Sequence, residues 1–224
     1  APGDPLEDRH ADLAAALQAV TEETTFHLLR WLHGRTGADG VCLAGGVALN
    51  SVLNGKIRDA TPFREVFIPP AAGDAGTAYG AAAWAAHAIA GEARHSVLAH
   101  DFWGPEIRED EIARALAGRH LPSRTLADPP REAARLIADG KIIGWVQGRM
   151  EYGPRALGAR SILVDPRRAE TKDRLNRLKR RESFQPFAPA VPIERAADWF
   201  EDAQPSPFML KVMPVRPEKR GVIP

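Results

Sequence analysis

The chain has 224 residues, of which 44% are hydrophobic and 26% are charged, so it can form one large or two small domains with a buried core. Its net charge of +1 excludes binding to nucleic acid or membrane through overall charge alone. The single cysteine excludes an intramolecular disulfide framework, and no apolar run is long enough to span a membrane, so we predict a cytoplasmic protein.

The first part of the chain predicts one long helix. Apolar residues recur at roughly helical spacing from His10 to His33, and Gly34 marks the predicted end. His27 and His33 are six residues apart, which does not place them on one helical face as a metal pair. Residues 1–9 are polar and contain Pro and Gly, so we expect an irregular start.

A short strand followed by two glycines comes next. Residues 40–44 are apolar, which predicts a buried strand with Cys42 as a small core residue. Gly45 and Gly46 lead from this strand into a helix that extends to about Arg58. This layout can present backbone N–H groups and a helix N-terminus to a phosphate, although a double glycine after a strand also makes a simple tight turn.

The same layout then recurs. Residues 64–68 predict a second short strand, residues 71–78 form a loop of small residues, and an alanine-rich helix follows to about Ala90. Asp74 lies where a helix N-cap belongs, so it is either a plain cap or a metal or nucleotide ligand at the tip of this unit. Two such units pointing the same way are typical of an α/β protein with a shared ligand cleft.

The apolar period weakens between residues 91 and 130, where only a short helix over residues 109–118 is predicted. We therefore place a domain boundary between about residues 100 and 127. Beyond it we predict helices, strands and a proline-limited edge strand. The helices cover residues 131–139, 169–180 and 194–200, and the strands cover residues 141–146, 161–165, 186–191 and 208–215.

The segment of residues 148–163, here called the arginine loop, follows the predicted strand at residues 141–146. Arg149, Arg155 and Arg160 stand among three glycines and a proline, which favour a tight, non-helical path. Guanidinium groups offer planar, paired donors suited to phosphate or carboxylate. The loop therefore predicts an anion-binding site, with a merely solvated basic loop as the alternative.

Positive charge continues beyond this loop. Residues 149–181 contain eleven Lys or Arg against four Asp or Glu, although the whole chain carries a net charge of only +1. Either a polyanionic small molecule or an RNA backbone could use such a segment.

Three blocks of the sequence resemble the O-carbamoyltransferases of nodulation-factor and antibiotic biosynthesis. The blocks are residues 43–50 (LAGGVALN), residues 70–78 (PAAGDAGTA), and residues 148–165 (beginning GRMEYGPRALGARSIL) with residues 179–191. They follow the family's order over nearly the whole chain. The resemblance implies an α/β fold in two modules. Residues 1–100 would be the second lobe of an actin-like (ASKHA) domain, residues 101–126 a linker, and residues 127–224 the N-terminal part of a YrdC-like α/β domain.

The resemblance also implies a reaction. Members of this family make carbamoyl-adenylate from ATP and the co-substrate carbamoyl phosphate, and then transfer the carbamoyl group to a hydroxyl of a small molecule such as a natural product or a sugar. The implied cofactors are ATP, Mg²⁺ and, at the transfer site, Fe²⁺ or another divalent metal.

Roles for individual residues follow from the matched blocks. Three residues fall in a nucleotide-contacting glycine loop: Gly45, Gly46 and Asn50. The resemblance makes Asp74 the metal ligand. Four residues fall in the anion-binding block: Arg149, Arg155, Arg160 and Ser161. A Lys-x-Arg element contributes the phosphate-contacting Lys179 and Arg181, which act with Arg155 as the catalytic residues.

Some parts of the family pattern are missing. The family's metal-binding histidines lie in an N-terminal lobe that this chain does not contain, and the family continues beyond Pro224. The resemblance therefore implies an internal portion of a longer enzyme, whose partners would be the missing N-terminal lobe, the C-terminal remainder and a small-molecule hydroxyl acceptor.

Two alternatives remain open at this point. The first is a threonylcarbamoyl-type enzyme that modifies tRNA. The joining of both module types in one chain favours the small-molecule transferase over this alternative. The second is a non-catalytic nucleotide-binding fragment. Binding of tRNA with a steep salt dependence would favour the first.

Overall fold

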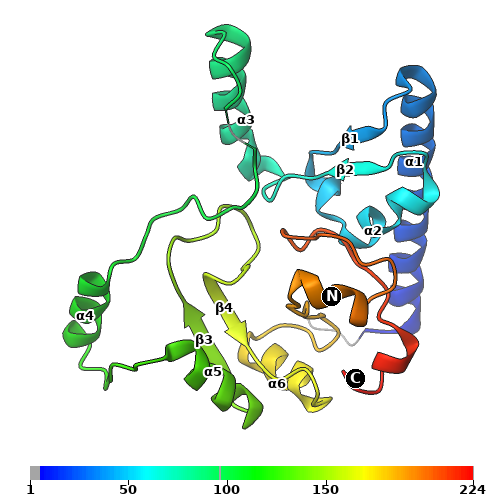
Figure 1. The fold of residues 1–224 in the computed structure, drawn as a ribbon. Coiled ribbons are helices and arrows are strands. Elements are labelled where there is room, and N and C mark those ends of the chain that lie inside the picture. The colour runs from blue at the N-terminus through cyan, green and yellow to red at the C-terminus, as the bar shows by residue number, and fades with distance from the viewer. Residues whose placement is uncertain (1–5, 96, 224) are drawn as a thin grey trace. The chain divides into compact units, whose positions relative to one another are not determined.

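A computed structural model describes residues 6–95 and 97–223 of the chain. These residues divide into two compact units (Figure 1). Unit 1 comprises residues 6–95 together with Leu210–Val212, and unit 2 comprises residues 97–209 and 213–223. Helices and small sheets occur in both units, so the predicted α/β class is confirmed at this level. Most of the irregular start predicted for residues 1–9 lies outside the described residues.

The packed part of unit 1 consists of two helices and a two-stranded parallel sheet. Helix α1 covers Asp8–Thr36, α2 covers Ser51–Ala60, and strands β1 (Gly40–Cys42) and β2 (Glu65–Phe67) pair in parallel, with Val41 opposite Val66. The predicted order of strand, turn and helix is thus confirmed. Helix α1 ends two residues later than predicted, because the left-handed turn that stops it lies at Gly37 (φ 62°).

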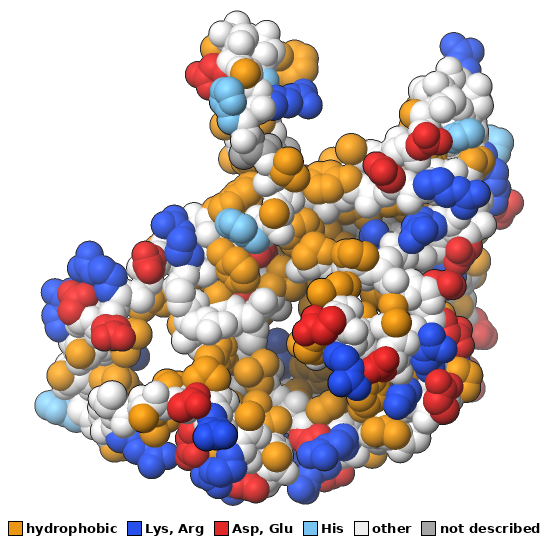
Figure 2. All heavy atoms as spheres, in the orientation of Figure 1, with side chains coloured by type: hydrophobic (Ala, Val, Ile, Leu, Met, Phe, Trp, Pro, Cys, Tyr) orange, Lys and Arg blue, Asp and Glu red, His pale blue; other side chains and the backbone are white. Residues whose placement is uncertain are grey.

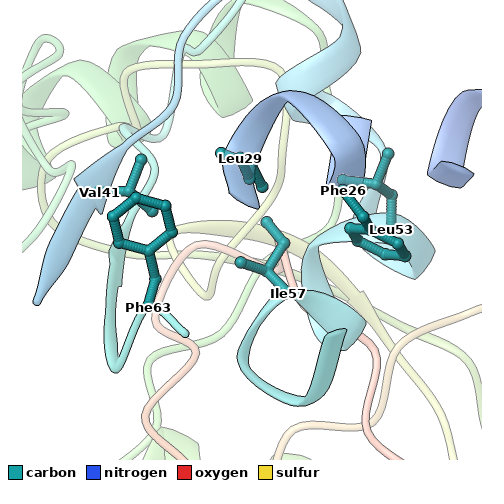
Figure 3. Packing of buried hydrophobic residues seen from close by; sticks show 6 residues of the cluster. All are labelled: Phe26, Leu29, Val41, Leu53, Ile57 and Phe63. Atoms are coloured by element: carbon teal, nitrogen blue, oxygen red, sulfur yellow. The ribbon is translucent and has the colours of Figure 1, made fainter. Parts of the chain in front are cut away.

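The core of unit 1 lies between these helices and the first strand, as Figure 3 shows. Leu53 and Ile57 are fully buried, and their spacing of four residues places both on the face of α2 that packs towards α1. Burial of one such side chain stabilises the fold by about 1.5–3 kcal/mol. The six core residues are Phe26, Leu29, Val41, Leu53, Ile57 and Phe63.

The expectation that Cys42 lies in the core is wrong. Strand β1 has three residues that alternate between exposed and buried, and Cys42 is exposed. The apolar sequence suggested burial on both faces, but the sheet of unit 1 contains two strands and its second face is not covered along β1. Apolar content alone does not show how many faces of a strand are covered.

The alanine-rich segment is helical as predicted. A 3₁₀ turn at Asp74–Gly76 leads into α3 (Thr77–Trp84), and a π turn (Ala85–Ile89) continues it. None of its residues is buried, and Trp84 and Ile89 are 68% and 76% exposed. Figure 2 shows hydrophobic side chains on the surface of this helix.

A three-residue segment from late in the chain, Leu210–Val212, packs against α2. The Val212 N–H donates to the Ser51 carbonyl (3.0 Å), and the buried Asn54 amide donates to the carbonyls of Ala48 (2.8 Å) and Leu210 (3.0 Å). At Gly55 the backbone of this segment comes so close to α2 that an added Cβ would overlap the Val212 carbonyl oxygen. The close contact between Leu210–Val212 and α2 therefore requires glycine at position 55.

We expect Gly55→Ala to loosen Leu210–Val212 from α2, although alanine in place of a helical glycine normally stabilises by about 0.5–1 kcal/mol. The measurement is hydrogen exchange at the Val212 amide, which should speed up. Gly34→Ala is the matched control, because no atom lies within 4 Å of a Cβ there. Unchanged exchange at Val212 would contradict the close contact.

Unit 2 contains an antiparallel strand pair flanked by helices. Strands β3 (Ile143–Val146) and β4 (Arg160–Leu163) pair with Ile143 opposite Leu163, and α5 (Pro129–Ala138) packs next to β3. Helices α4 (Glu109–Gly118) and α6 (Glu170–Leu178) agree with the predicted segments, and the short helix predicted at residues 194–200 is a 3₁₀ helix at Ile193–Asp198.

Two strands predicted late in the chain do not form among the described residues. Residues 186–191 and 208–215 form no strand in the described part of the chain, and the second segment has only an isolated bridge between Val215 and Phe200. Pro186 and Pro189 remove backbone donors from the first segment, and Pro192 follows it directly. In the second, Met209 has a left-handed φ of 56°, which interrupts an extended path.

Within residues 6–95 and 97–223, no helix is both long enough and apolar enough to cross a bilayer.

Candidate anion-binding site

The arginine loop follows β3 and ends with β4, and it pairs with a segment that precedes it by about fifty residues. The Gly104 N–H donates to the Met150 carbonyl (2.9 Å), the Met150 N–H donates to the Pro105 carbonyl (3.1 Å), and Glu106 bridges with Arg149. A Cβ at Gly104 would lie 2.8 Å from the Met150 oxygen, so glycine permits this approach. Residues 101–106, which the sequence placed in a linker, therefore run beside the loop.

Glu151 is the centre of the arginine loop. Its side chain is fully buried, and one carboxylate oxygen accepts hydrogen bonds from the backbone N–H groups of Leu157 (2.7 Å) and Ala159 (2.8 Å). The other oxygen pairs with the Arg160 Nε at 3.0 Å. The Glu151 carboxylate thus connects the start of the loop to residues 157–160 near its end.

This arrangement affects the ionisation of Glu151. Burial alone works against the charged form, but hydrogen bonds from Leu157, Ala159 and Arg160 outweigh it and lower the pKa of Glu151 below its ordinary value of 4.5. The loop therefore contains a carboxylate that is charged near neutral pH and fully occupied by donors.

Arg160 and Ser161 have structural partners. Besides its pair with Glu151, Arg160 donates through Nη2 to the carbonyl of Gly153 (2.9 Å) and, at 3.4 Å, to that of Arg155. The Ser161 hydroxyl accepts from the Gly158 N–H at 3.0 Å. Both residues were predicted to bind an anion, but in this conformation they make hydrogen bonds within the loop.

Arg155 differs from Arg160. Its Nε is buried and has no hydrogen-bond partner within the described part of the chain. A buried, unpaired donor on a cation is costly, so such a group calls for an acceptor. Of the arginines in this loop, Arg155 is therefore the best-placed ligand for an anion.

Arg149 lies on the ribbon formed with residues 101–106. Its Nη2 donates to the Trp103 carbonyl at a long 3.3 Å, while its side chain is exposed. This weak contact leaves most of its five donors for a ligand.

Asp101 is a functional candidate that sequence reasoning missed. It is 3% exposed, its Oδ2 is buried without a hydrogen-bond partner among the described residues, and its carbonyl accepts from the Tyr152 N–H (2.6 Å). Burial raises the pKa of Asp101, and the neighbouring Glu151 carboxylate adds to the effect. No spacing rule links Asp101 to a loop fifty residues later, so only the fold reveals it.

The Lys-x-Arg element lies just after α6, where Lys179 caps the helix. The Arg181 Nε donates to the Asn176 side-chain oxygen (2.6 Å), and its guanidinium carbon lies 4.3 Å from the centre of the Phe187 ring. Lys179 makes no side-chain hydrogen bond or ion pair with the rest of the described chain. Lys179 is thus open to a ligand, whereas Arg181 is held in place.

Asn176 is a second residue that the sequence did not single out. It is 1% exposed, and its amide donates to the carbonyls of Ser183 and Gln185, both at 3.0 Å. Asn176 also accepts a hydrogen bond from Arg181, so its side chain holds three residues of the segment after α6.

In unit 1 the glycine loop is tightly folded. Gly45 has a φ of 102°, a conformation that favours glycine, and its N–H donates to the Ala72 carbonyl (2.7 Å). Gly46 begins a 3₁₀ helix that ends at Leu49. The Asn50 amide caps α2 through the Leu53 N–H and pairs with Gln18, so its polar atoms already have protein partners.

Asp74 does not cap a helix, so that part of the prediction is wrong. Gly73 takes the capping position, and no side-chain cap hydrogen bond forms there. The Asp74 carboxylate is exposed and unpaired, and no group of three or more His, Cys, Asp or Glu able to hold a metal occurs in residues 6–95 and 97–223. The described residues alone therefore do not fit a metal ion.

The structure thus brings together some of the predicted site residues and not others. Arg149, Arg155, Arg160 and Ser161 share one loop. No hydrogen bond or ion pair within the described residues joins this loop to Lys179 or Arg181. The predicted ligands of the glycine loop and Asp74 belong to unit 1.

These features define an α/β protein with an internally hydrogen-bonded arginine loop, in which the buried Nε of Arg155 has no partner among the described residues. Comparison with known families agrees with the order of the two units. Residues 4–83 match the family model described as "Carbamoyltransferase N-terminus", and residues 134–224 match that described as "Carbamoyltransferase C-terminus". The chain belongs to the carbamoyltransferase family.

Two relatives cover 99% of the chain. It is 45% identical to the "Nodulation protein NolNO" of Sinorhizobium fredii and 43% identical to the "Nodulation protein NolO" of Bradyrhizobium diazoefficiens. A "Nodulation protein U" of Rhizobium tropici is 36% identical over 86% of the chain. The chain spans 34%, 42% and 32% of the lengths of these three proteins.

Proposed function

We propose that this chain is part of an ATP-dependent O-carbamoyltransferase. The proposed reaction forms carbamoyl-adenylate from carbamoyl phosphate and ATP and then transfers the carbamoyl group to a hydroxyl of a small molecule. Family membership supports carbamoyl transfer. The single observation that supports an anionic substrate in unit 2 is the buried, unpaired Nε of Arg155.

The chemistry explains why such a guanidinium is needed. For atoms to balance, water must first release phosphate from carbamoyl phosphate, leaving carbamate. A carbamate oxygen then attacks the α-phosphorus of ATP, and pyrophosphate leaves. Since carbamoyl phosphate, carbamate and ATP are all anionic, fixed cations must offset their repulsion, and a preorganised loop does so without rearranging during the reaction.

Three residues would provide this charge. Arg155 would bind the reacting group, while Arg149 and Lys179 would bind the remaining phosphate oxygens, because their side chains are the other accessible cations among the predicted ligands. Arg160, Ser161 and Arg181 would support the site through their internal hydrogen bonds.

In the second step the acceptor hydroxyl attacks the carbamoyl carbon, AMP leaves, and the hydroxyl proton passes to a base. We assign this step to the actin-like lobe that unit 1 would form, with Gly45 and Gly46 near the nucleotide, and unit 2 to a YrdC-like domain. A divalent metal at Asp74 would require donors from outside the described residues, so no step is derived from it.

The test is titration calorimetry of the 224-residue chain with carbamoyl phosphate and with ATP. We expect both to bind, and Arg155→Ala to weaken carbamoyl phosphate at least about tenfold, because a hydrogen bond to a charged group contributes about 1.5–3 kcal/mol. In the full-length enzyme, carbamoyl-phosphate-dependent exchange of pyrophosphate into ATP should be lost in Arg155→Ala.

Asp74→Ala is the matched control, because Asp74 is a charged residue of unit 1 and its carboxylate has no partner in the described structure. It should leave carbamoyl phosphate binding unchanged. Equal binding by the wild-type chain and Arg155→Ala would overturn the anion site.

A further inference from the structure

Four aromatic side chains form a cluster on the ribbon beside the arginine loop. Trp103 stacks against Tyr152, with ring centres 6.1 Å apart and planes inclined by 24°. His100 stacks against Phe102 at 5.9 Å and meets Trp103 edge-on at 6.5 Å. We call these four residues the aromatic platform.

The aromatic platform is not buried. Phe102 is 36% exposed and Trp103 is 37% exposed, and His100 is also exposed, while Tyr152 is half-buried. Large aromatic surfaces gathered at a protein surface mark a place where an apolar or flat ligand binds.

The backbone beneath the platform is fixed. The Trp103 N–H donates to the Asp101 carbonyl (2.8 Å), the Tyr152 N–H donates to the same oxygen (2.6 Å), and Gly104 pairs with Met150. A ligand that stacks on these rings therefore does not have to order a mobile segment, which lowers the cost of binding.

A cation lies next to the rings. Arg149 donates to the carbonyl of Trp103 itself (3.3 Å), and the backbone of Arg149 bridges with Glu106 three residues further on. The same loop carries Arg155, whose buried Nε has no hydrogen-bond partner among the described residues. The surface thus combines a flat aromatic area with positive charge, and a ligand that joins a planar ring to phosphates complements both.

We propose that the aromatic platform binds the purine base of ATP, with Trp103 as the main stacking residue and Arg149 beside the phosphates. The proposal rests on the proposed function, because that function supplies the triphosphate. An uncharged sugar or an apolar chain would use the rings but not the guanidinium groups, so the charge favours a nucleotide.

The test separates the base from the phosphates. ATP and inorganic tripolyphosphate carry comparable negative charge, and only ATP has a base. We expect the 224-residue chain to bind ATP at least about tenfold more tightly than tripolyphosphate in calorimetry, because stacking of a base on an aromatic side chain provides this much affinity. Trp103→Leu should abolish this preference without changing tripolyphosphate binding, and Trp103→Phe should retain part of it.

Trp84→Leu is the matched control, since Trp84 is a 68% exposed tryptophan of unit 1. It should bind both ligands as the wild type does. If the wild type binds the two ligands equally, or if Trp103→Leu keeps the preference for ATP, the aromatic platform is not the base site while the anion site stands. If neither tripolyphosphate nor carbamoyl phosphate binds, the proposed function itself fails.

Discussion

Replacing Glu151 with alanine is expected to destabilise unit 2 by about 3 kcal/mol and to disorder the arginine loop. Removal of one partner of a buried ion pair typically costs about 3–5 kcal/mol, and the lower value applies because Arg160 remains 35% exposed. The variant also leaves the N–H groups of Leu157 and Ala159 without their acceptor. Arg155 lies between Glu151 and these groups, so its position should be lost as well.

The measurement is urea denaturation combined with hydrogen exchange at the Leu157 and Ala159 amides. Both amides should exchange much faster in Glu151→Ala. Asp110→Ala is the control, because Asp110 pairs with Arg108 and Arg114 on an exposed surface and should cost less than about 1 kcal/mol. If the two amides remain protected in Glu151→Ala, this carboxylate does not organise the loop.

The same carboxylate gives the loop a defined dependence on pH. Because the folded-state pKa of Glu151 lies below its ordinary value of 4.5, its stabilising contribution is fully present above about pH 4.5 and is lost as the pH falls through the folded-state pKa. Protection of the Leu157 and Ala159 amides should therefore decrease only in acid. Glu151→Gln, which cannot titrate, should show no such decrease.

The sequence predicts the helices of this chain well because their signals are local. Helices α2 and α4 are each ten residues long, so the residues that determine them lie close together in the sequence, and both helices form as expected. Strands need a partner strand elsewhere in the chain, and the runs at residues 186–191 and 208–215 join no sheet in the described structure. Their composition could not reveal this.

The arginine loop illustrates the same limit within a site. The spacing of its glycines and arginines predicts an anion-binding loop, but it cannot show which arginine is engaged. Glu151 neutralises Arg160 rather than Arg155, a choice determined by the three-dimensional path of the loop. Sequence reasoning treated Glu151 as one acidic residue in a basic segment, although its place among glycines and arginines was a usable signal.

Asn176 illustrates the limit for residues outside any motif. An asparagine in the last turns of a basic helix is an ordinary polar residue in the sequence. The fold buries it and surrounds it with two carbonyls and a guanidinium, so its side chain has a donor and an acceptor role at once.

For this reason Asn176→Ala is expected to destabilise unit 2 by about 2–4 kcal/mol, because each buried polar group left without a partner costs about 1–3 kcal/mol. The carbonyls of Ser183 and Gln185 lose their donor, and Arg181 loses the acceptor of its Nε. Arg181 should then be held only by the Pro186 carbonyl and the Phe187 ring. Urea denaturation measures the loss, and the NMR signal of the Arg181 Nε–H reports its release.

Asn176→Asp separates the two roles of this side chain. Aspartate keeps an acceptor for Arg181 but turns an oxygen towards the carbonyls of Ser183 and Gln185, so it should be about as unstable as the alanine variant while retaining the Arg181 signal. Lys172→Ala, at an exposed position of the same helix, should leave both unchanged. Wild-type stability in Asn176→Asp would mean that the carbonyls do not depend on Asn176. In that case Asn176 would position only Arg181 and not the rest of the segment after α6.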